Sequence, residues 1–127
     1  MKILGIDYGK SKIGLAISEN DLAEPYLVLK NSNTLAGILG IIKDNYIEKI
    51  VIGLTGGVID EEIRKFGDEI KTKTNLPVVY ADETLSTQDA QRVLIESGKS
   101  RKRRREIEDA VAAAIMLQCF IEGGSHD

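Results

Sequence analysis

The stretch that decides the fold is residues 1–18, MKILGIDYGKSKIGLAIS, in which two apolar runs flank a short polar turn. Apolar runs of this length, rich in Ile and bounded by Gly and Lys, predict two buried strands joined by a hairpin. Asp7 stands where the first of these strands leaves the core. An ionised carboxylate is costly to desolvate at such a place unless a cation meets it. Asp7 therefore either accepts hydrogen bonds from the turn that follows it or belongs to a functional site.

The composition is typical of one compact domain, since the chain has 127 residues, of which 43% are hydrophobic and 29% charged. We expect residues 1–127 to form that single domain. No apolar stretch approaches the roughly 20 residues that span a bilayer, and no basic and apolar leader precedes the first strand. We therefore expect a cytoplasmic protein that makes no contact with a membrane.

The chain has one cysteine and one histidine, which limits the kinds of catalytic and metal sites that it can form. One cysteine, Cys119, excludes an internal disulfide, and its apolar neighbours predict a small buried hydrophobe rather than a nucleophile. One histidine, His126, lies beside a Gly-Gly-Ser stretch, which argues against a histidine-dependent triad or a zinc site. Acid–base chemistry is therefore left to carboxylates, lysines or metal-bound water.

Basic residues are concentrated in one short segment of an otherwise acidic chain. The formal net charge is −3, yet six of the 17 basic residues lie within positions 99–105, namely Lys99, Arg101, Lys102, Arg103, Arg104 and Arg105. Arginine guanidinium groups bind phosphate in a bidentate manner, so this segment predicts a polyanionic partner. A solvated or disordered charge run is the alternative.

The periodicity of apolar residues predicts a mixed α/β fold. The run at 49–54, KIVIGL, is almost continuously apolar and too short for a helix, so we expect a strand buried on both faces. Three antiparallel strands followed by alternating helices and strands imply a five-stranded mixed sheet with helices on both faces. The expected strands are at about 2–7, 12–18, 26–29, 49–54 and 77–81, and the expected helices at about 34–45, 59–74, 86–97 and 104–122.

Two acidic segments adjoin the expected sheet. Asp82 and Glu83 follow the fifth strand, and Asp109 lies in the first turns of the last helix, beside the small residues that pack against the sheet. In open α/β sheets, functional residues gather beyond the carboxyl ends of the parallel strands. Taken alone, Asp82 and Glu83 fit slightly better as helix-entry residues, because acids favour the positive N-terminus of a helix.

Four segments carry a family resemblance: GIDYGKSKIGLA at 5–16, VIGL at 51–54, DETLSTQDA at 82–90 and DAVAAAIMLQ at 109–118. In this order they resemble the family of pre-16S rRNA nucleases, also called YqgF or RuvX-like Holliday junction resolvases. The resemblance implies a ribonuclease H-like fold, and by position it places the family's three acidic residues on Asp7, Glu83 and Asp109. The chain departs from the usual family pattern at two places. The loop after 51–54 is shorter and lacks the proline that the family commonly has there, and position 84 is threonine where the family usually has arginine.

Three converging carboxylates would repel one another, and a divalent cation resolves that conflict. Oxygen ligands without His or Cys favour Mg²⁺ or Mn²⁺ over zinc. Two such ions about 4 Å apart suit the hydrolysis of a phosphodiester. We expect Asp7 to bridge the ions, with Glu83 and Asp109 on either side. Asp82 and Glu108 are alternative ligands because each is adjacent in sequence, but we expect them to lie around the ligands or in solvent.

Nucleic-acid contacts are expected around this centre, although hairpin lysines and turn glycines also occur without that role. The candidates for phosphate binding are Lys10 and Lys12 on the first hairpin and the backbone amides of Gly53, Thr55, Gly56 and Gly57. The segment Arg101, Lys102, Arg103, Arg104 and Arg105 would hold the nucleic-acid backbone with a strength that falls as salt rises.

The favoured function is metal-dependent hydrolysis of phosphodiester bonds in the precursor of 16S rRNA, with structured RNA as the partner. Resolution of branched DNA junctions is the nearest alternative, and it would need two sites and hence a homodimer rather than a monomer. A nucleic-acid-binding protein without catalysis is an alternative of another class. A nucleotide-binding protein related to actin-like ATPases is a third, but 127 residues supply only one of their two lobes.

Overall fold

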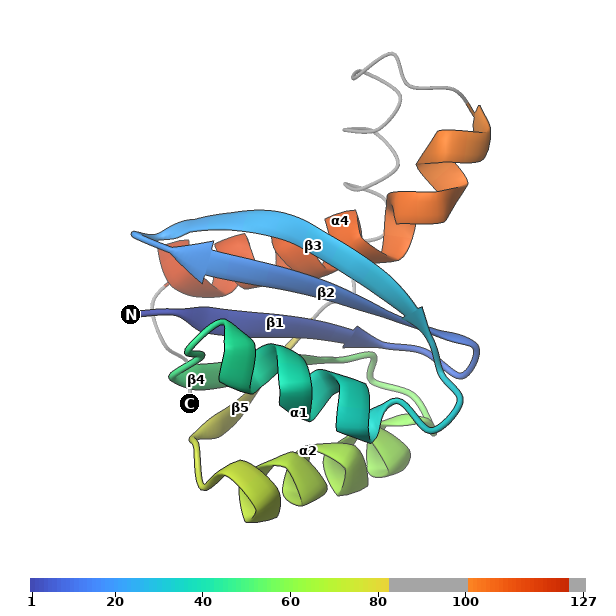
Figure 1. The fold of residues 1–127 in the computed structure, drawn as a ribbon. Helices are drawn as coiled ribbons and strands as arrows, with labels where there is room; N and C mark the ends of the chain where they lie inside the picture. The colour runs from blue at the N-terminus through green and yellow to red at the C-terminus, as the bar shows by residue number, and fades with distance from the viewer. Residues whose placement is uncertain (83–100, 124–127) are drawn as a thin grey trace.

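The computed structural model describes residues 1–82 and 101–123, and within the second range it describes side chains from residue 107 onward. The strands are β1 Ile3–Tyr8, β2 Lys12–Glu19, β3 Leu22–Lys30, β4 Lys49–Leu54 and β5 Val78–Asp82, and the helices are α1 Leu35–Asp44, α2 Asp60–Thr74 and α4 Arg101–Glu122. The described strands form one sheet in the order β3-β2-β1-β4-β5 (Figure 1). The first three strands pair antiparallel, whereas β1, β4 and β5 run parallel, which confirms the expected mixed sheet.

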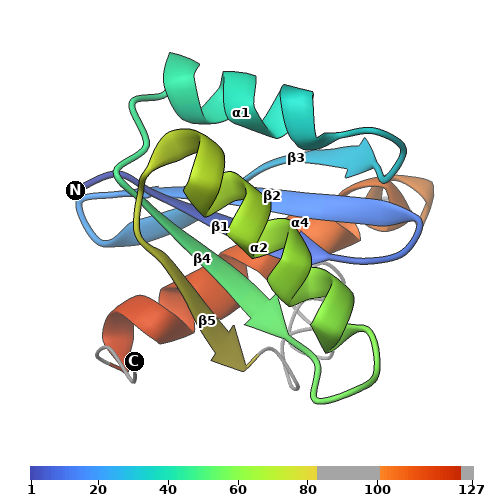
Figure 2. The ribbon, with the colours of Figure 1, turned by 90° about the horizontal axis from the view of Figure 1, so that it is seen from below.

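The central strand β1 sends alternate side chains to the two faces of the sheet. Leu4, Ile6 and Tyr8 are buried on the face covered by α1 and α2. Gly5 faces α4 on the other side, where a Cβ at residue 5 would lie 3.0 Å from the Cβ of Leu117. Figure 2 shows α2 in front of the sheet and α4 behind it, and the buried residues of α1 share one cluster with those of α2. Because strand residues alternate, Asp7 shares the face of Gly5 and α4.

The strand β4 confirms the expectation of a segment buried on both faces. Ile50 and Ile52 are fully buried among the side chains of α1 and α2, and Val51 is fully buried against α4. Helices cover both faces of a parallel pair, so a strand inside it is apolar throughout. The expected bounds of this strand, 49–54, agree with the structure.

The strand β3 begins at Leu22, four residues before the expected start. Asn20 and Asp21 have positive φ angles of 58° and 67°, so they form a tight two-residue hairpin that carries the chain straight back into pairing. Pro25 is tolerated because β3 lies at the edge of the sheet and the pairing with β2 shifts register beside it.

The helix α4 also differs from expectation. It begins at Arg101 rather than near Arg104, so residues 101–103 also lie in its first turns instead of preceding it. Cys119 is exposed, and the expected buried position was wrong. The buried face passes through Ala113 and Leu117, and a residue two positions after Leu117 points to the opposite side of a helix.

The expected helix at 86–97 lies outside the described residues. None of the described helices combines the length and the apolar character needed to cross a membrane.

Candidate active site

The carboxyl ends of the three parallel strands lie at one edge of the sheet. Ile6 of β1 pairs with Ile52 of β4, and Gly53 of β4 pairs with Ala81 of β5. Asp7 is one residue beyond Ile6, so it lies level with Gly53 and Ala81. Because β1 is the middle strand of the five described strands, Asp7 stands at the centre of this edge.

Asp109 reaches the same edge from α4. Gly14 is the residue of β2 that pairs with Asp7, and a Cβ at Gly14 would overlap the backbone carbonyl group of Asp109. Paired residues of an antiparallel ladder point to the same face, so Asp7 points toward the face on which Asp109 lies. The missing side chain at Gly14 therefore allows the backbone of α4 to lie directly beside the position of Asp7.

Burial raises the pKa of the Asp109 carboxyl, which is half-buried. The positive charge of Lys12 acts in the opposite direction, and the neighbouring Glu108 raises the pKa further. Asp7 is also half-buried. A partly desolvated carboxyl beside other acids is a group that a bound cation would stabilise in its ionised form.

The third expected acid, Glu83, lies outside the described residues. Within residues 1–82 and 101–123, no three acidic, histidine or cysteine side chains gather closely enough to hold a metal ion. Asp82 is the exposed last residue of β5. Ala81 packs on the face of α4, so the alternation of the strand places Asp82 on the opposite face from Asp7. This geometry disfavours Asp82 as a substitute ligand.

The first hairpin carries Lys10 and Lys12, both of which are exposed at the candidate edge. The amide of Gly9 donates to the carbonyl of Lys12 at 2.9 Å, and the side-chain amide of Asn31 donates to the carbonyl of Gly9 at 2.7 Å. On the other face of the sheet, the hydroxyl of Tyr8 donates to Glu62 of α2. These contacts tie the turn after Asp7 to two further segments, and sequence reasoning did not anticipate them.

The loop after β4 does not offer the free amides that were expected there. The amide and hydroxyl of Thr55 donate to Asp60 at 2.9 and 2.8 Å, and the amide of Gly56 donates to the same carboxylate at 2.8 Å. The amide of Gly57 donates to the Thr55 hydroxyl at 3.0 Å, and Gly53 is buried. The candidate phosphate donors of this loop are thus engaged by an internal carboxylate.

Asp60 was missed because its role depends on a loop conformation that spacing alone does not reveal. Desolvation opposes ionisation of this carboxyl, but hydrogen bonds from Thr55 and Gly56 hold its pKa below the ordinary value. The sequence signal that points to it is an acid in the first turn of a helix, shortly after a Thr-Gly-Gly turn.

The basic residues 101–105 occupy the start of the helix that also carries Asp109. Arg105 precedes Asp109 by four residues, which is about 6 Å along the helix axis. Figure 1 shows that these first turns of α4 extend beyond the sheet. The expected basic segment therefore ends about one helical turn before an expected catalytic acid.

Comparison with known proteins identifies the family. Residues 1–123 match the family described as RuvX, Holliday junction resolvase. A protein of Syntrophomonas wolfei named as a pre-16S rRNA nuclease is 35% identical over 136 residues, covering 98% of this chain and 96% of that protein. A protein of Endomicrobium trichonymphae with the same name is 39% identical over 134 residues, covering 95% of each chain.

Solved structures confirm the ribonuclease H-like fold. RuvC of T. thermophilus in complex with a Holliday junction substrate matches with a TM-score of 0.61 and 19% identity, covering 97% of this chain and 94% of that one. The fowlpox virus resolvase, in a complex with Holliday junction DNA, matches with a TM-score of 0.68 and 14% identity, covering 97% and 98%. The chain therefore belongs to the RuvX family and is a nuclease, a hydrolase that acts on phosphodiester bonds.

Proposed function

We propose that this nuclease trims the precursor of 16S rRNA, with Asp7, Glu83 and Asp109 as its metal-binding catalytic residues. The observation that carries the proposal is the close approach of the Asp109 backbone to Gly14, the partner of Asp7. This approach brings acids 102 positions apart in the sequence to one face and one edge of the sheet. The names of the curated relatives support the RNA substrate.

The donor set suits Mg²⁺ or Mn²⁺. Asp7 and Asp109 supply hard oxygen ligands, and the raised pKa of Asp109 marks a carboxyl that a cation would help to ionise. Glu83 completes the set by its place in the family motif. Divalent ions bound there would supply an activated water and neutralise charge on the leaving oxygen.

The protein's own cations would bind the substrate. Lys12 acts electrostatically on Asp109, so a phosphate near the acids would also feel its charge. Lys10 is exposed on the same hairpin, and the basic residues 101–105 end about one helical turn before Asp109. Contacts of this kind bind the sugar–phosphate backbone without reading sequence, so the structure of the RNA would choose the cleavage site. The substrate also implies action in the cytoplasm.

Cleavage of Holliday junctions is the second candidate, favoured by the family description and by the fold shared with two junction resolvases. Cutting a junction symmetrically needs two sites, so this activity requires a homodimer, whereas trimming an RNA end can be done by a monomer.

The deciding experiment offers a precursor rRNA end and a four-way DNA junction side by side, with and without Mn²⁺. We expect Mn²⁺-dependent cleavage of the RNA, lost in Asp7→Asn and in Asp109→Asn while both variants keep their fold and bind RNA. Asp44→Asn, an exposed acid at the end of α1, is the matched control and should cleave normally. Undiminished cleavage by Asp7→Asn would refute the site, and tight binding without turnover would favour a non-catalytic binding protein.

A further inference from the structure

A groove of about 550 Å³ lies at the end of the sheet opposite the candidate active site. It is formed by the hairpin that joins β2 and β3 and by the end of α1, where Asn45 contributes to its wall. The hairpin follows Ser18, which pairs with Ile3 at the amino end of β1. Asp7 stands at the carboxyl end of the same strand, so an occupant of the groove would leave the acidic edge open.

The lining of the groove includes apolar side chains that are exposed to solvent. Leu22 and Tyr26 retain 59% and 46% of their exposure, and Ile17 and Pro25 complete the apolar lining. The side-chain amide of Asn45 lies 3.5 Å from the Tyr26 hydroxyl and also donates to the carbonyl of Ile41 at 2.9 Å. Tyr26 is therefore linked to α1. Exposed aromatic and aliphatic groups beside polar ones are typical of interaction sites.

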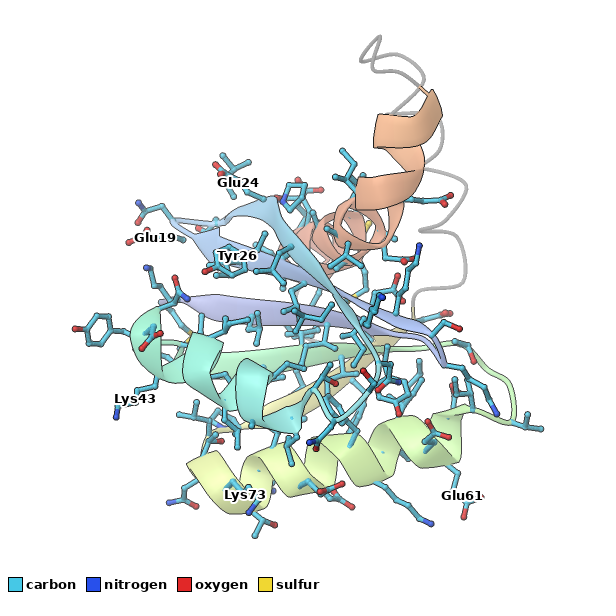
Figure 3. The ribbon with its side chains drawn as sticks, turned by 45° about the vertical axis from the view of Figure 1, so that its right-hand side comes forward. Glu19, Glu24, Tyr26, Lys43, Glu61 and Lys73 are labelled. Atoms are coloured by element: carbon cyan, nitrogen blue, oxygen red, sulfur yellow. The ribbon has the colours of Figure 1, made fainter. Side chains whose placement is uncertain are left out.

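The charge of the groove indicates the chemistry of its occupant. Glu19 and Glu24 belong to the lining, and none of the described lining residues is basic. Lys2 lies 3.9 Å from Glu19 and offsets part of the negative charge of the groove. Substitution of Glu24 therefore tests the role of that charge more directly than substitution of Glu19. Figure 3 shows Glu19, Glu24 and Tyr26 at the same end of the sheet. Two carboxylates repel nucleic acid and attract a cationic group.

We propose that this groove docks a segment of a basic protein, with apolar side chains covering Leu22 and Tyr26 and a lysine or arginine beside Glu24. The proposal goes beyond nuclease activity, because it assigns the acidic end of the molecule to a protein partner. The basic start of α4 lies at the other end of the molecule, where it is available to nucleic acid (Figure 1). One molecule could thus hold an RNA and a basic protein bound to that RNA at the same time.

The test uses the full chain and a fluorescently labelled synthetic peptide in which leucines alternate with lysines and arginines. Binding is followed by fluorescence anisotropy at physiological ionic strength. Two control peptides replace the basic residues by glutamate or the leucines by serine. We expect saturable binding of the first peptide and at least tenfold weaker binding of both controls.

Single substitutions test whether the peptide binds in the groove. We expect Glu24→Lys to weaken binding of the peptide about fivefold, because the substitution replaces an electrostatic attraction with a repulsion at an exposed site. Leu22→Ser should weaken it to a similar degree. Glu61→Lys makes the same charge change on α2, far from the groove in Figure 3, and should leave binding unchanged. Cleavage of bare RNA should be normal in all three variants, which separates this proposal from that of the catalytic site.

Several results would overturn the proposal. These are the absence of measurable peptide binding, equal binding of the serine control peptide, or equal weakening by Glu61→Lys and Glu24→Lys. A homodimer in sedimentation equilibrium that dissociates in Leu22→Ser would show that a second copy of the chain fills the groove instead. Weakened RNA binding in Leu22→Ser would assign the groove to nucleic acid.

Discussion

The backbone carbonyl of Asp109 lies against Gly14, the residue that pairs with Asp7 across the β1–β2 ladder. A glycine at this position leaves room for the backbone of α4 where any other residue would place a Cβ. The contact matters because it joins α4 to the ladder at the level of Asp7, while Gly5 allows a second close approach of the same helix at Leu117. The geometry of the candidate site therefore depends on glycines in β1 and β2 that leave room for α4.

Gly14→Ala is expected to destabilise the protein and to separate the two acids. The added methyl group would overlap the backbone of α4, which cannot yield as a flexible side chain does, so we expect a loss of about 2–3 kcal/mol in urea unfolding. Cleavage should fall as well. Gly37→Ala on α1 is the matched control, because nothing lies within 4 Å of its added Cβ, and it should be neutral or stabilising. Equal stability of wild type and Gly14→Ala would contradict the contact.

Asp109→Asn is expected to raise the melting temperature at neutral pH. Burial raises the pKa of Asp109 above the ordinary 3.8, so the folded state binds this proton more tightly than the unfolded state. The contribution of Asp109 to stability is therefore most favourable at acid pH and declines as pH rises through the folded-state pKa. Asparagine does not titrate, so its advantage should grow between about pH 3 and pH 7.

Melting curves across that pH range check this expectation, with Glu122→Gln at the exposed end of α4 as the control for net charge. A difference between Asp109→Asn and wild type that stays constant with pH would contradict it. Mn²⁺ should raise the melting temperature of wild type more than that of Asp109→Asn, because a ligand of the native state stabilises it.

Thr55→Ala is expected to affect stability rather than RNA binding. The Thr55 hydroxyl accepts from Gly57 and donates to Asp60, so its loss should lower the melting temperature by a few degrees. Thr55→Ser keeps the hydroxyl and should behave as wild type. A weaker affinity for RNA in Thr55→Ala, restored by serine, would instead show that Thr55 contacts the substrate.

Tyr8→Phe is expected to cost about 1 kcal/mol in the free energy of unfolding, the usual value of one hydrogen bond. The variant loses the hydroxyl contact with Glu62 but keeps the ring, whose centroid lies 5.0 Å from that of Phe66. Tyr46→Phe is the control, since Tyr46 is 81% exposed, and it should leave stability unchanged. If both variants are equally stable, the Tyr8 contact does not hold the hairpin to α2.

The paired change Arg103→Gln and Arg105→Gln is expected to weaken RNA binding and to reduce its salt dependence. Each lost phosphate contact should lower the slope of log Kd against log salt by about one. Binding is measured over a range of KCl concentrations. Lys73→Gln on the exposed side of α2 should not alter the slope. An unchanged slope in the arginine variant would show that the basic segment is only solvated.

Local sequence patterns predicted most elements but failed where a conformation depends on particular backbone angles. The bounds of β4 agree with expectation because an apolar run flanked by polar residues has few alternatives. The start of β3 was placed too late, because Asn20 and Asp21 adopt positive φ angles that shorten the turn. The amides after β4 were assigned to phosphate because the competing carboxylate of Asp60 is visible only in the folded loop.

The sequence by itself determined the order of the described strands and helices along the chain, the basic segment 101–105 and the family, because periodicity, charge runs and motifs are properties of neighbouring residues. Only the tertiary structure decided that Asp7 and Asp109 share a face and that Asp82 lies on the opposite one. The physical reason is that strand pairing and helix packing join distant segments, and their register follows from contacts such as that of Gly14 with α4. The same packing leaves Leu22 and Tyr26 exposed in an acidic groove, and no local sequence pattern predicts that groove.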